Sequence, residues 1–192
     1  MNSDLKDLVC RTRSYRAYDP APVTEETLRE LVDVARLTNN GMNMQELKYR
    51  LVTGDEAAGL HTEVRWAGLL SVKLPPEGAC PPAYILICLD TAVRGEAATE
   101  KIDVGIAAEA IALAATERGL GSCMLGSFDR GHLAGTLHLP EGLIPELLLS
   151  IGKPAETVVL TDLPADGKTA YYRDAAGTHF VPKRPLDDVI VR

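Results

Sequence analysis

The sequence is poor in cysteine and in aromatic residues, and it has no excess of positive charge. Its 192 residues include four cysteines, and only 5% are aromatic. Four cysteines without a Cys-x-x-Cys pair exclude a disulfide scaffold and predict a reduced, cytoplasmic protein. The formal net charge of −7 disfavours a broad nucleic-acid surface, because duplex binding depends on neutralising phosphates. We therefore expect no nucleic-acid partner.

Long hydrophobic runs are also missing. The longest apolar stretches, residues 83–89 and 144–152, have the length of strands, whereas a helix needs about 20 apolar residues to cross a bilayer. The N-terminus lacks the basic and then apolar layout of a signal peptide. With 46% apolar and 24% charged residues, the composition is that of a folded globular protein. We expect one domain over residues 1–192 and no membrane partner.

The common catalytic and nucleotide-binding motifs are absent as well. Gly119-Leu-Gly121 begins a dinucleotide-binding fingerprint, but Met124 stands where the last glycine belongs. Gly167 and the Lys-Thr after it could end a phosphate-binding loop, but Asp162 replaces the first glycine. The histidines lack zinc-site spacing, and there is no Gly-x-Ser-x-Gly elbow. We predict no metal and no catalytic side chain, which suggests that a bound cofactor supplies the chemistry.

Hydrophobic periodicity predicts a mixture of helices and strands. Thr24 is expected to cap a helix over residues 25–37, and Gly119 to end the longest helix, over 101–118. Further helical structure is expected at 4–10, weakly at 57–70, and from residue 129. The expected strands are 49–53, 83–89, 122–125, 146–151 and 157–160, followed by a hairpin whose strands flank a turn at 174–177.

Small residues form a stripe along the longest predicted helix. Gly105, Ala108, Ala112 and Ala115 recur at spacings of three and four, which places them on one face. Such a stripe lets another backbone approach closely. It fits either a helix in the core of its own chain or a helix in a subunit interface, and the sequence alone favours the core helix.

One basic cluster stands out in this acidic chain. Within six residues it contains Arg11, Thr12, Arg13, Ser14 and Arg16. Because a guanidinium can donate two parallel hydrogen bonds to phosphate oxygens, the cluster suits a phosphate monoester. The alternative is a solvated basic turn that pairs with surface acids.

Three further segments carry polar groups. Residues 39–45 are dense in amides, which suit the edge of a heteroaromatic ring. Residues 119–129 contain a strand end followed by Gly126, where backbone N–H groups can come close to a ligand. Lys183 and Arg184, flanked by prolines, form a second basic pair.

Taken together, these segments resemble the nitroreductase-type flavin oxidoreductase family. The resemblance covers nearly the whole chain, with the motifs in the family's order. They are Arg-Ser-x-Arg at residues 13–16, Asn-x-Gln at 43–45, the alanine-rich helix leading to Gly-Leu-Gly-Ser-Cys at 119–123, Ser-Ile-Gly-Lys-Pro at 150–154 and Lys-Arg-Pro-Leu at 183–186. The ordered set makes the resemblance specific.

The resemblance implies an FMN site. Arg13, Ser14 and Arg16 would hold the phosphate and the ribityl chain, helped by Lys183 or Arg184. The backbone N–H of Gly126, or one near it at Leu125, would face flavin N5. Residues 39–43 would contact the flavin from the partner subunit, because members of the family are intertwined homodimers. The cofactor-binding residues implied on this segment are Asn39, Asn40, Gly41, Asn43 and Gln45.

The resemblance also implies a fold and an activity. The fold would be α+β, with a central mixed or antiparallel sheet packed by helices and a long helix in the dimer interface. The activity would be hydride transfer from NADH or NADPH, through FMN, to a small organic acceptor of nitroaromatic or quinone-like type.

The chain departs from the family pattern at several positions. Asn39-Asn40 stands where Pro-Ser is frequent, and Glu46-Leu47 where Pro-Trp is frequent. Residues 54–82, which help to shape the substrate pocket in the family, match no family motif. Two alternatives therefore stay open: a non-catalytic flavin- or nucleotide-binding protein, and a specialised flavin enzyme such as a dehalogenase.

Overall fold

The computed structural model describes residues 5–68, 70, 72–95 and 100–191. Its centre is a four-stranded antiparallel sheet in the order β1-β2-β4-β3. These strands are β1 (Leu47–Thr53), β2 (Ala83–Asp90), β3 (Gly121–Leu125) and β4 (Leu143–Gly152). The predicted α+β fold with an antiparallel central sheet is confirmed.

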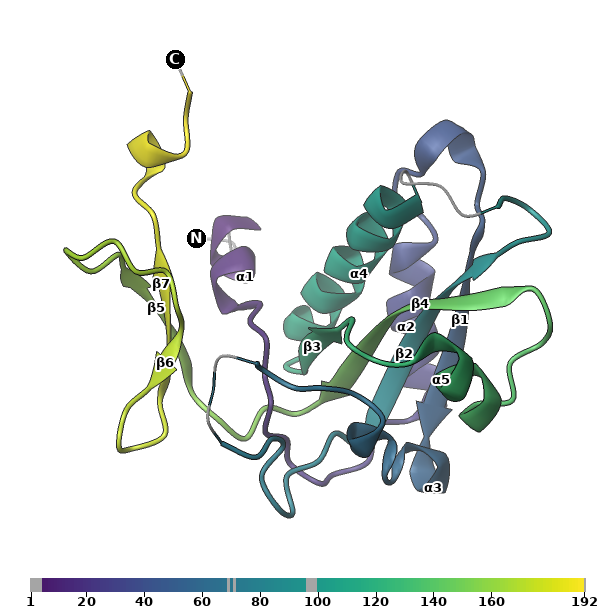
Figure 1. Ribbon diagram of the computed structural model, residues 1–192, viewed down its shortest axis with the longest axis horizontal. Coiled ribbons are helices and arrows are strands. Elements are labelled where there is room, and N and C mark those ends of the chain that lie inside the picture. Colours follow the sequence, from purple (N-terminus) through teal and green to yellow (C-terminus); the bar gives the residue numbers. More distant parts are fainter. Residues whose placement is uncertain (1–4, 69, 71, 96–99, 192) are drawn as a thin grey trace.

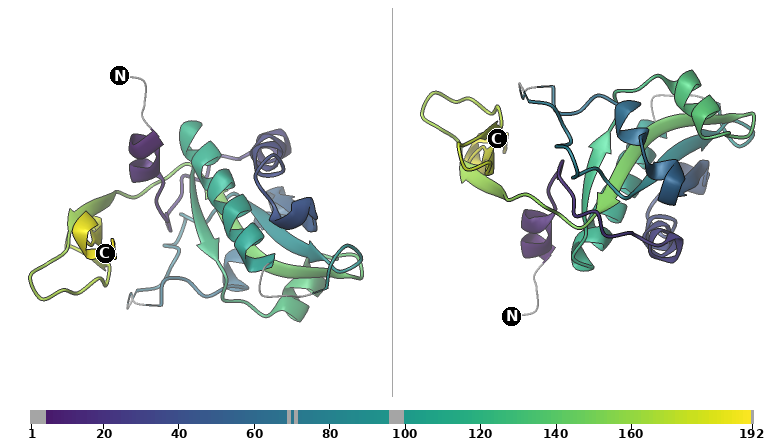
Figure 2. Two further views of the ribbon diagram at one scale, coloured as in Figure 1. Left: turned by 90° about the horizontal axis from the view of Figure 1, so that it is seen from above. Right: turned by 90° about the horizontal axis from the view of Figure 1, so that it is seen from below.

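A second, three-stranded sheet follows in the order β5-β7-β6. It consists of β5 (Val158–Asp162), β6 (Tyr172–Arg173) and β7 (His179–Lys183). Figures 1 and 2 show this sheet as an arm to one side of the central sheet, with α1 (Leu5–Arg11) on the side that faces it. We call residues 153–191 the C-terminal arm.

Helices cover both faces of the central sheet. One face carries α2 (Glu25–Ala35) and α4 (Glu100–Glu117), and the other carries α3 (Gly54–Ala57) and α5 (Arg130–Thr136). Three short 3-10 helices are η1 (Gly41–Asn43), η2 (Leu60–Thr62) and η3 (Leu186–Asp188). None of the helices in the described residues is both long enough and apolar enough to span a membrane.

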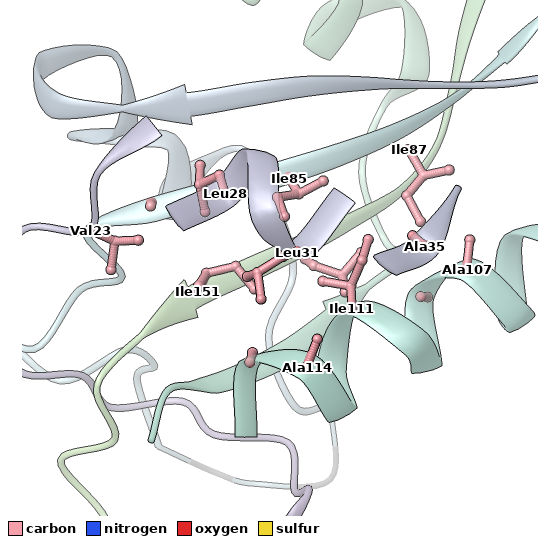
Figure 3. Close-up of a cluster of buried hydrophobic side chains, with 14 of the residues drawn as sticks. Val23, Leu28, Leu31, Ala35, Ile85, Ile87, Ala107, Ile111, Ala114 and Ile151 are labelled. Atoms are coloured by element: carbon pink, nitrogen blue, oxygen red, sulfur yellow. The ribbon is translucent and has the colours of Figure 1, made fainter. Parts of the chain in front are cut away.

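The core lies in two layers because β2 is apolar on both faces. Ile85 and Ile87 point toward α2 and α4, where Figure 3 shows them beside Leu31 and Ile111. Their neighbour Leu86 belongs to the second cluster, on the α5 side of the sheet. Side chains alternate between the faces of a strand, so a strand covered on both faces reads as a continuous apolar run. The central sheet is therefore held rigidly between helices.

Local signals placed the helix ends and strands correctly. The Thr24 hydroxyl caps α2 by accepting the Thr27 N–H at 3.1 Å. Gly119, just after α4, has φ +74°, a conformation that favours glycine. The predicted strands and the hairpin turn at 174–177 are present. Of the predicted helix at 4–10, residue 4 lies outside the described residues.

The prediction of helical structure over residues 57–70 was wrong. The helix α3 ends at Ala57, Gly59 has φ +87°, and beyond η2 the described residues are irregular; residue 69 lies outside them. Ala57, Leu60 and Val64 are all buried in the second cluster. Their spacing of three and four residues resembles that of a helix, but here an irregular segment of the chain buries each side chain in turn.

The stripe of small residues on α4 is mostly buried within its own chain. Ala108, Ala112 and Ala115 are at most 2% exposed, as expected for a core helix. Gly105 is exposed, and beside it Ile102 and Ile106 are 62% and 37% exposed. The exposed apolar face of α4 is therefore a different face from the alanine stripe.

Two glycines allow close packing at the edge of the central sheet. A Cβ at Gly152 would lie 2.8 Å from Cδ1 of Tyr18, and one at Gly121 would lie 2.7 Å from Cγ of Pro154 and overlap the Tyr15 ring. Gly121 is the first residue of β3. The absence of its side chain lets the segment after α1 lie directly against β3.

We expect Gly121→Ala to destabilise the protein by about 1–3 kcal/mol, because the added methyl group must displace the rings of Tyr15 and Pro154. Urea unfolding measures this change in the free energy of unfolding. The matched control is Gly135→Ala in α5, where no atom lies within 4 Å of the new Cβ. That variant should be neutral or more stable by up to about 1 kcal/mol. Equal effects of the two substitutions would contradict the packing argument.

Candidate functional site

The segment after α1 is tied to the edge of the central sheet by backbone hydrogen bonds. The Tyr15 N–H donates to the Ser122 carbonyl of β3 at 2.9 Å, and the Ala155 N–H donates to the Ala17 carbonyl at 2.9 Å. Tyr18 is buried, and its hydroxyl lies 2.7 Å from the Tyr15 carbonyl and 2.8 Å from the Ser150 hydroxyl. The arginines of this segment are thereby placed between β3 and the C-terminal arm.

The carboxylate of Glu156 joins this segment to the arm. One oxygen accepts the backbone N–H groups of Arg16 and Ala17, the latter at 3.1 Å. The other oxygen forms an ion pair with the Arg173 guanidinium of β6. The Glu156 side chain is 6% exposed. A buried carboxylate is stabilised only when it is paired and hydrogen-bonded, and these donors meet that requirement.

A cavity of about 330 Å³ lies between these parts of the chain. Its walls come from the segment after α1, from α4 and β3, and from the C-terminal arm. The lining residues are Thr12, Arg13, Ser14, Arg16, Glu109, Ala112, Ser122, Met124, Val158, Tyr171, His179, Val181 and Lys183. Three of them carry a permanent positive charge against one carboxylate, so the cavity is cationic although the chain as a whole is acidic.

Arg16 and His179 form the buried centre of this cavity. They are 8% and 1% exposed, and Nη1 of Arg16 lies 3.4 Å from Nε2 of His179. The Arg16 guanidinium also lies 5.1 Å from the ring centre of Tyr171. Burial, together with the charges of Arg16 and Arg173, lowers the pKa of His179 from 6.5 to about 4. His179 is therefore neutral at pH 7.

Several donors in the cavity have no acceptor among the described residues. Nε of Arg13, Nε of Arg16 and Nδ1 of His179 are buried without a hydrogen-bond partner. Buried polar groups are normally paired, so unpaired donors at a cationic cavity indicate a ligand that brings acceptor atoms. The donor set suits a phosphate group, which offers several strong acceptors and negative charge.

The structure brings four of the predicted site residues together. Arg13, Ser14, Arg16 and Lys183 all line the cavity. Arg184 is exposed and does not line it, which separates the two members of the basic pair.

The two residues predicted at the end of β3 lie outside the cavity lining. The Leu125 side chain is buried in the second core cluster, and Gly126 is exposed just after the strand. At the end of β3 it is Met124, on the opposite face of the strand from Leu125, that reaches the cavity.

The amide-rich segment 39–45 lies at a second cavity of about 220 Å³, which is lined by Asn39, Asn40, Asn43 and Gln45 together with Asp103 and Ala107 of α4. The Gly41 N–H donates to Oδ1 of Asp103 at 2.9 Å, and the Asn40 side chain accepts the Gln45 N–H at 2.9 Å. Asp103 and Ala107 lie on roughly the opposite side of α4 from Glu109 and Ala112. Within one chain, the two sets of predicted residues therefore belong to separate cavities.

Most of the cavity-lining residues that come from the C-terminal arm were not predicted from the sequence. Tyr171 and His179 flank the hairpin turn and carry no local signal of a binding role, and Glu156 lies in a connecting segment. Cys123 of β3 is not a reactive thiol, because it is 4% exposed and burial raises its pKa to about 11. It is a structural residue. No cluster of three metal-ligating side chains occurs among the described residues.

The chain is similar in sequence to a family of known proteins. A model described as the Nitroreductase family matches residues 10–153. A curated protein of Methanothermobacter thermautotrophicus, provisionally named an NADH dehydrogenase/NAD(P)H nitroreductase, is 26% identical over 164 residues, which is 83% of this chain and 82% of that protein.

Solved structures show the same fold. A nitroreductase family protein of Clostridium difficile is 25% identical, with a TM-score of 0.61 over 78% of this chain and 83% of that one. One from Streptococcus pneumoniae is 17% identical, with a TM-score of 0.71 over 98% and 100%. A Desulfovibrio desulfuricans structure, described as a nitroreductase in complex with FMN, is 20% identical, with a TM-score of 0.70 over 100% and 98%.

The ion pair of Glu156 leads to a stability prediction. Glu156→Gln keeps the size of the side chain but removes its charge, and we expect a loss of up to about 3 kcal/mol, because Arg173, whose side chain is 19% exposed, loses its charged partner. The control is Glu30→Gln, which breaks the exposed pair with Arg118 at 3.2 Å and should cost less than about 1 kcal/mol. Chemical unfolding of both variants measures the difference. A Glu156→Gln variant as stable as the Glu30→Gln variant would show that this pair does not hold the arm.

Proposed function

The chain belongs to the Nitroreductase family, and on that premise we propose that it is an enzyme, an FMN-dependent oxidoreductase that works as a homodimer. It takes hydride from NADH or NADPH and reduces a small organic acceptor of nitroaromatic or quinone-like type. When bound, the flavin supplies the hydride-transfer chemistry. The side chains of this chain bind, orient and shield the cofactor.

The cationic cavity is the observation that carries this proposal. Arg13 and Arg16 present buried N–H donors without acceptors, and Lys183 adds a third positive charge. A phosphate monoester carries about −1.5 to −2 charges at neutral pH and several acceptor oxygens, so it matches these donors in charge and in number. In this assignment Ser14 donates to the phosphate or the ribityl chain, and Lys183, rather than Arg184, is the basic residue of the arm that contacts the phosphate.

The exposed face of α4 supports the homodimer. Ile102 and Ile106 lie on the part of the helix surface between the two cavities. A second copy packed on these side chains would bring its own segment 39–45 toward the first copy's phosphate-binding cavity. In this arrangement the isoalloxazine ring lies between two chains, with Asn39, Asn40, Gly41, Asn43 and Gln45 contributed by the partner. The end of β3, at Leu125 and Gly126, then offers backbone N–H groups to the ring.

The departures from the family pattern have a structural explanation. Glu46 is fully buried, accepts a hydrogen bond from the Asn40 amide at 3.1 Å and pairs with Arg94 at 3.6 Å. These residues support the segment that precedes β1. They do not favour a non-catalytic binding protein over an enzyme.

Phosphate recognition is tested by single substitutions in the cavity. We expect Arg13→Ala and Lys183→Ala each to weaken FMN binding about 10- to 100-fold, because a hydrogen bond to a charged group contributes about 1.5–3 kcal/mol. Riboflavin lacks the phosphate, so its binding should be unchanged. Quenching of flavin fluorescence in titrations of the apoprotein measures both affinities.

The matched control for these variants is Arg184→Ala. Arg184 is the neighbour of Lys183, but it follows the end of β7, is exposed and lies outside the cavity lining. This variant should bind FMN within about twofold of the wild type. If Arg184→Ala and Lys183→Ala weaken FMN equally, or if riboflavin binding falls in parallel with FMN binding, the phosphate assignment is wrong.

A rapid-mixing experiment distinguishes between an enzyme and a non-catalytic binding protein. We expect the protein purified under native conditions to be yellow, and its flavin absorbance to bleach on mixing with NADH or NADPH under anaerobic conditions and to return when a quinone or a nitroaromatic compound is added. A bound flavin that neither nicotinamide bleaches would contradict the enzyme and favour the binding protein. If only a halogenated substrate reoxidises the reduced flavin, and halide is released, the result would favour the dehalogenase.

A further inference from the structure

His179 is a buried imidazole that the proposed hydride transfer does not use. It is 1% exposed and lies on β7, opposite Arg173 in the ladder with β6. It lines the same cavity as Arg13, Arg16 and Lys183. A neutral, polar ring at the centre of a cationic cavity requires an explanation.

The proton on the ring can be placed from its contacts. A guanidinium only donates, so Nε2, which lies 3.4 Å from Nη1 of Arg16, is on the acceptor side of that pair. The ring N–H is then at Nδ1, which is buried and has no partner among the described residues. His179 therefore brings an unused donor to the cavity in addition to those of Arg13 and Arg16.

The charges around His179 come from each element packed against it. They are Arg13 and Arg16 of the segment after α1, Glu109 of α4, Glu156 before β5, Arg173 of β6 and Lys183 of β7. Four of the six are cationic, and Glu156 is already paired with Arg173. The net field disfavours a second proton on the ring, which agrees with the lowered pKa of His179.

We propose that His179 is a proton-linked phosphate-binding residue: it is neutral in the ligand-free protein, and it takes up a proton from solvent when a phosphate monoester binds in the cavity. This inference rests on the proposed function, because it identifies FMN as the phosphate monoester. The incoming dianion offsets the guanidinium charges, and its oxygens accept from a ring N–H of His179 and from the Arg16 guanidinium. The proton is added at Nε2, where a phosphate oxygen that accepts from both His179 and Arg16 replaces their direct contact, so the imidazole becomes a cation with two donors.

Thermodynamic linkage between proton binding and phosphate binding determines how the contribution of His179 to phosphate affinity changes with pH. A phosphate that raises the pKa of His179 must bind more tightly to the protonated ring, so the imidazole strengthens binding increasingly as pH falls through the bound-state pKa. Protonation of the phosphate itself, near pH 6, weakens binding over the same range in every variant. The contribution of His179 is therefore the ratio of the dissociation constants of a variant and the wild type, measured at several pH values.

The first measurement is FMN affinity from pH 8 to pH 5 for wild type and His179→Asn. Asparagine keeps a donor near the place of Nδ1 but does not titrate. We expect the penalty of the substitution to be about tenfold larger at pH 5 than at pH 8, because the phosphate-bound imidazole gains its proton within that range. The control is His138→Asn, an exposed histidine outside the cavity with φ +49°, which asparagine tolerates. A ratio that does not change with pH would overturn the proposal.

The second measurement needs no variant to fold. The imidazole resonances of the four histidines are titrated by NMR in wild-type protein alone, with riboflavin, with FMN and with inorganic phosphate. We expect the pKa of His179 to move upward by about two pH units with FMN and with phosphate, and to stay unchanged with riboflavin. Identical titration in all four samples would overturn the proposal. If FMN and riboflavin both fail to bind but phosphate shifts His179, the anion site stands and the proposed function fails.

Discussion

The Glu156 carboxylate connects the two parts of the chain that enclose the cavity. It accepts backbone N–H groups from Arg16 and Ala17 and holds the Arg173 guanidinium of the arm. Without this contact, the positive charges of Arg16 and Arg173 would face each other and His179 without compensation. A buried carboxylate with several donors offsets its own desolvation and fixes the direction of each donor. The geometry of the cavity depends on this one side chain.

The cavity concentrates charge that the fold does not need. Arg13, Arg16 and Lys183 are brought together although the remainder of the chain is acidic, and buried donors are left without acceptors. Such an arrangement lowers the stability of the ligand-free protein, and it is pre-organised for an anion, because little has to move when one binds. His179 is neutral in the ligand-free protein for the same reason, because the surrounding cations disfavour another positive charge.

The central sheet provides the rigid support for this arrangement. Its strand β2 is buried on both faces, and the close approach at Gly121 and Gly152 fastens the segment after α1 and the start of the arm to the edge of the sheet. The cavity is formed where these irregular segments meet the sheet. This division between a packed scaffold and a polar edge explains how a chain with few aromatic residues can present a ligand site built from guanidinium, hydroxyl and imidazole groups.

The sequence by itself determined the elements that local physics controls. The cap at Thr24, the turn after α4, the apolar strand β2 and the basic cluster at residues 11–16 all follow from neighbouring residues. The apolar spacing at 57–70 misled because buried anchors in an irregular chain can repeat at the same intervals as those of a helix.

Only the tertiary structure decided which groups meet at the cavity. Arg16 contacts Glu156 across 140 positions of the chain and His179 across 163. Lys183 lines the cavity because it shares one side of β7 with His179 and Val181, whereas Arg184 follows the strand and lies outside the lining. No local pattern encodes such pairs, because they form only when the arm is folded back against the edge of the sheet.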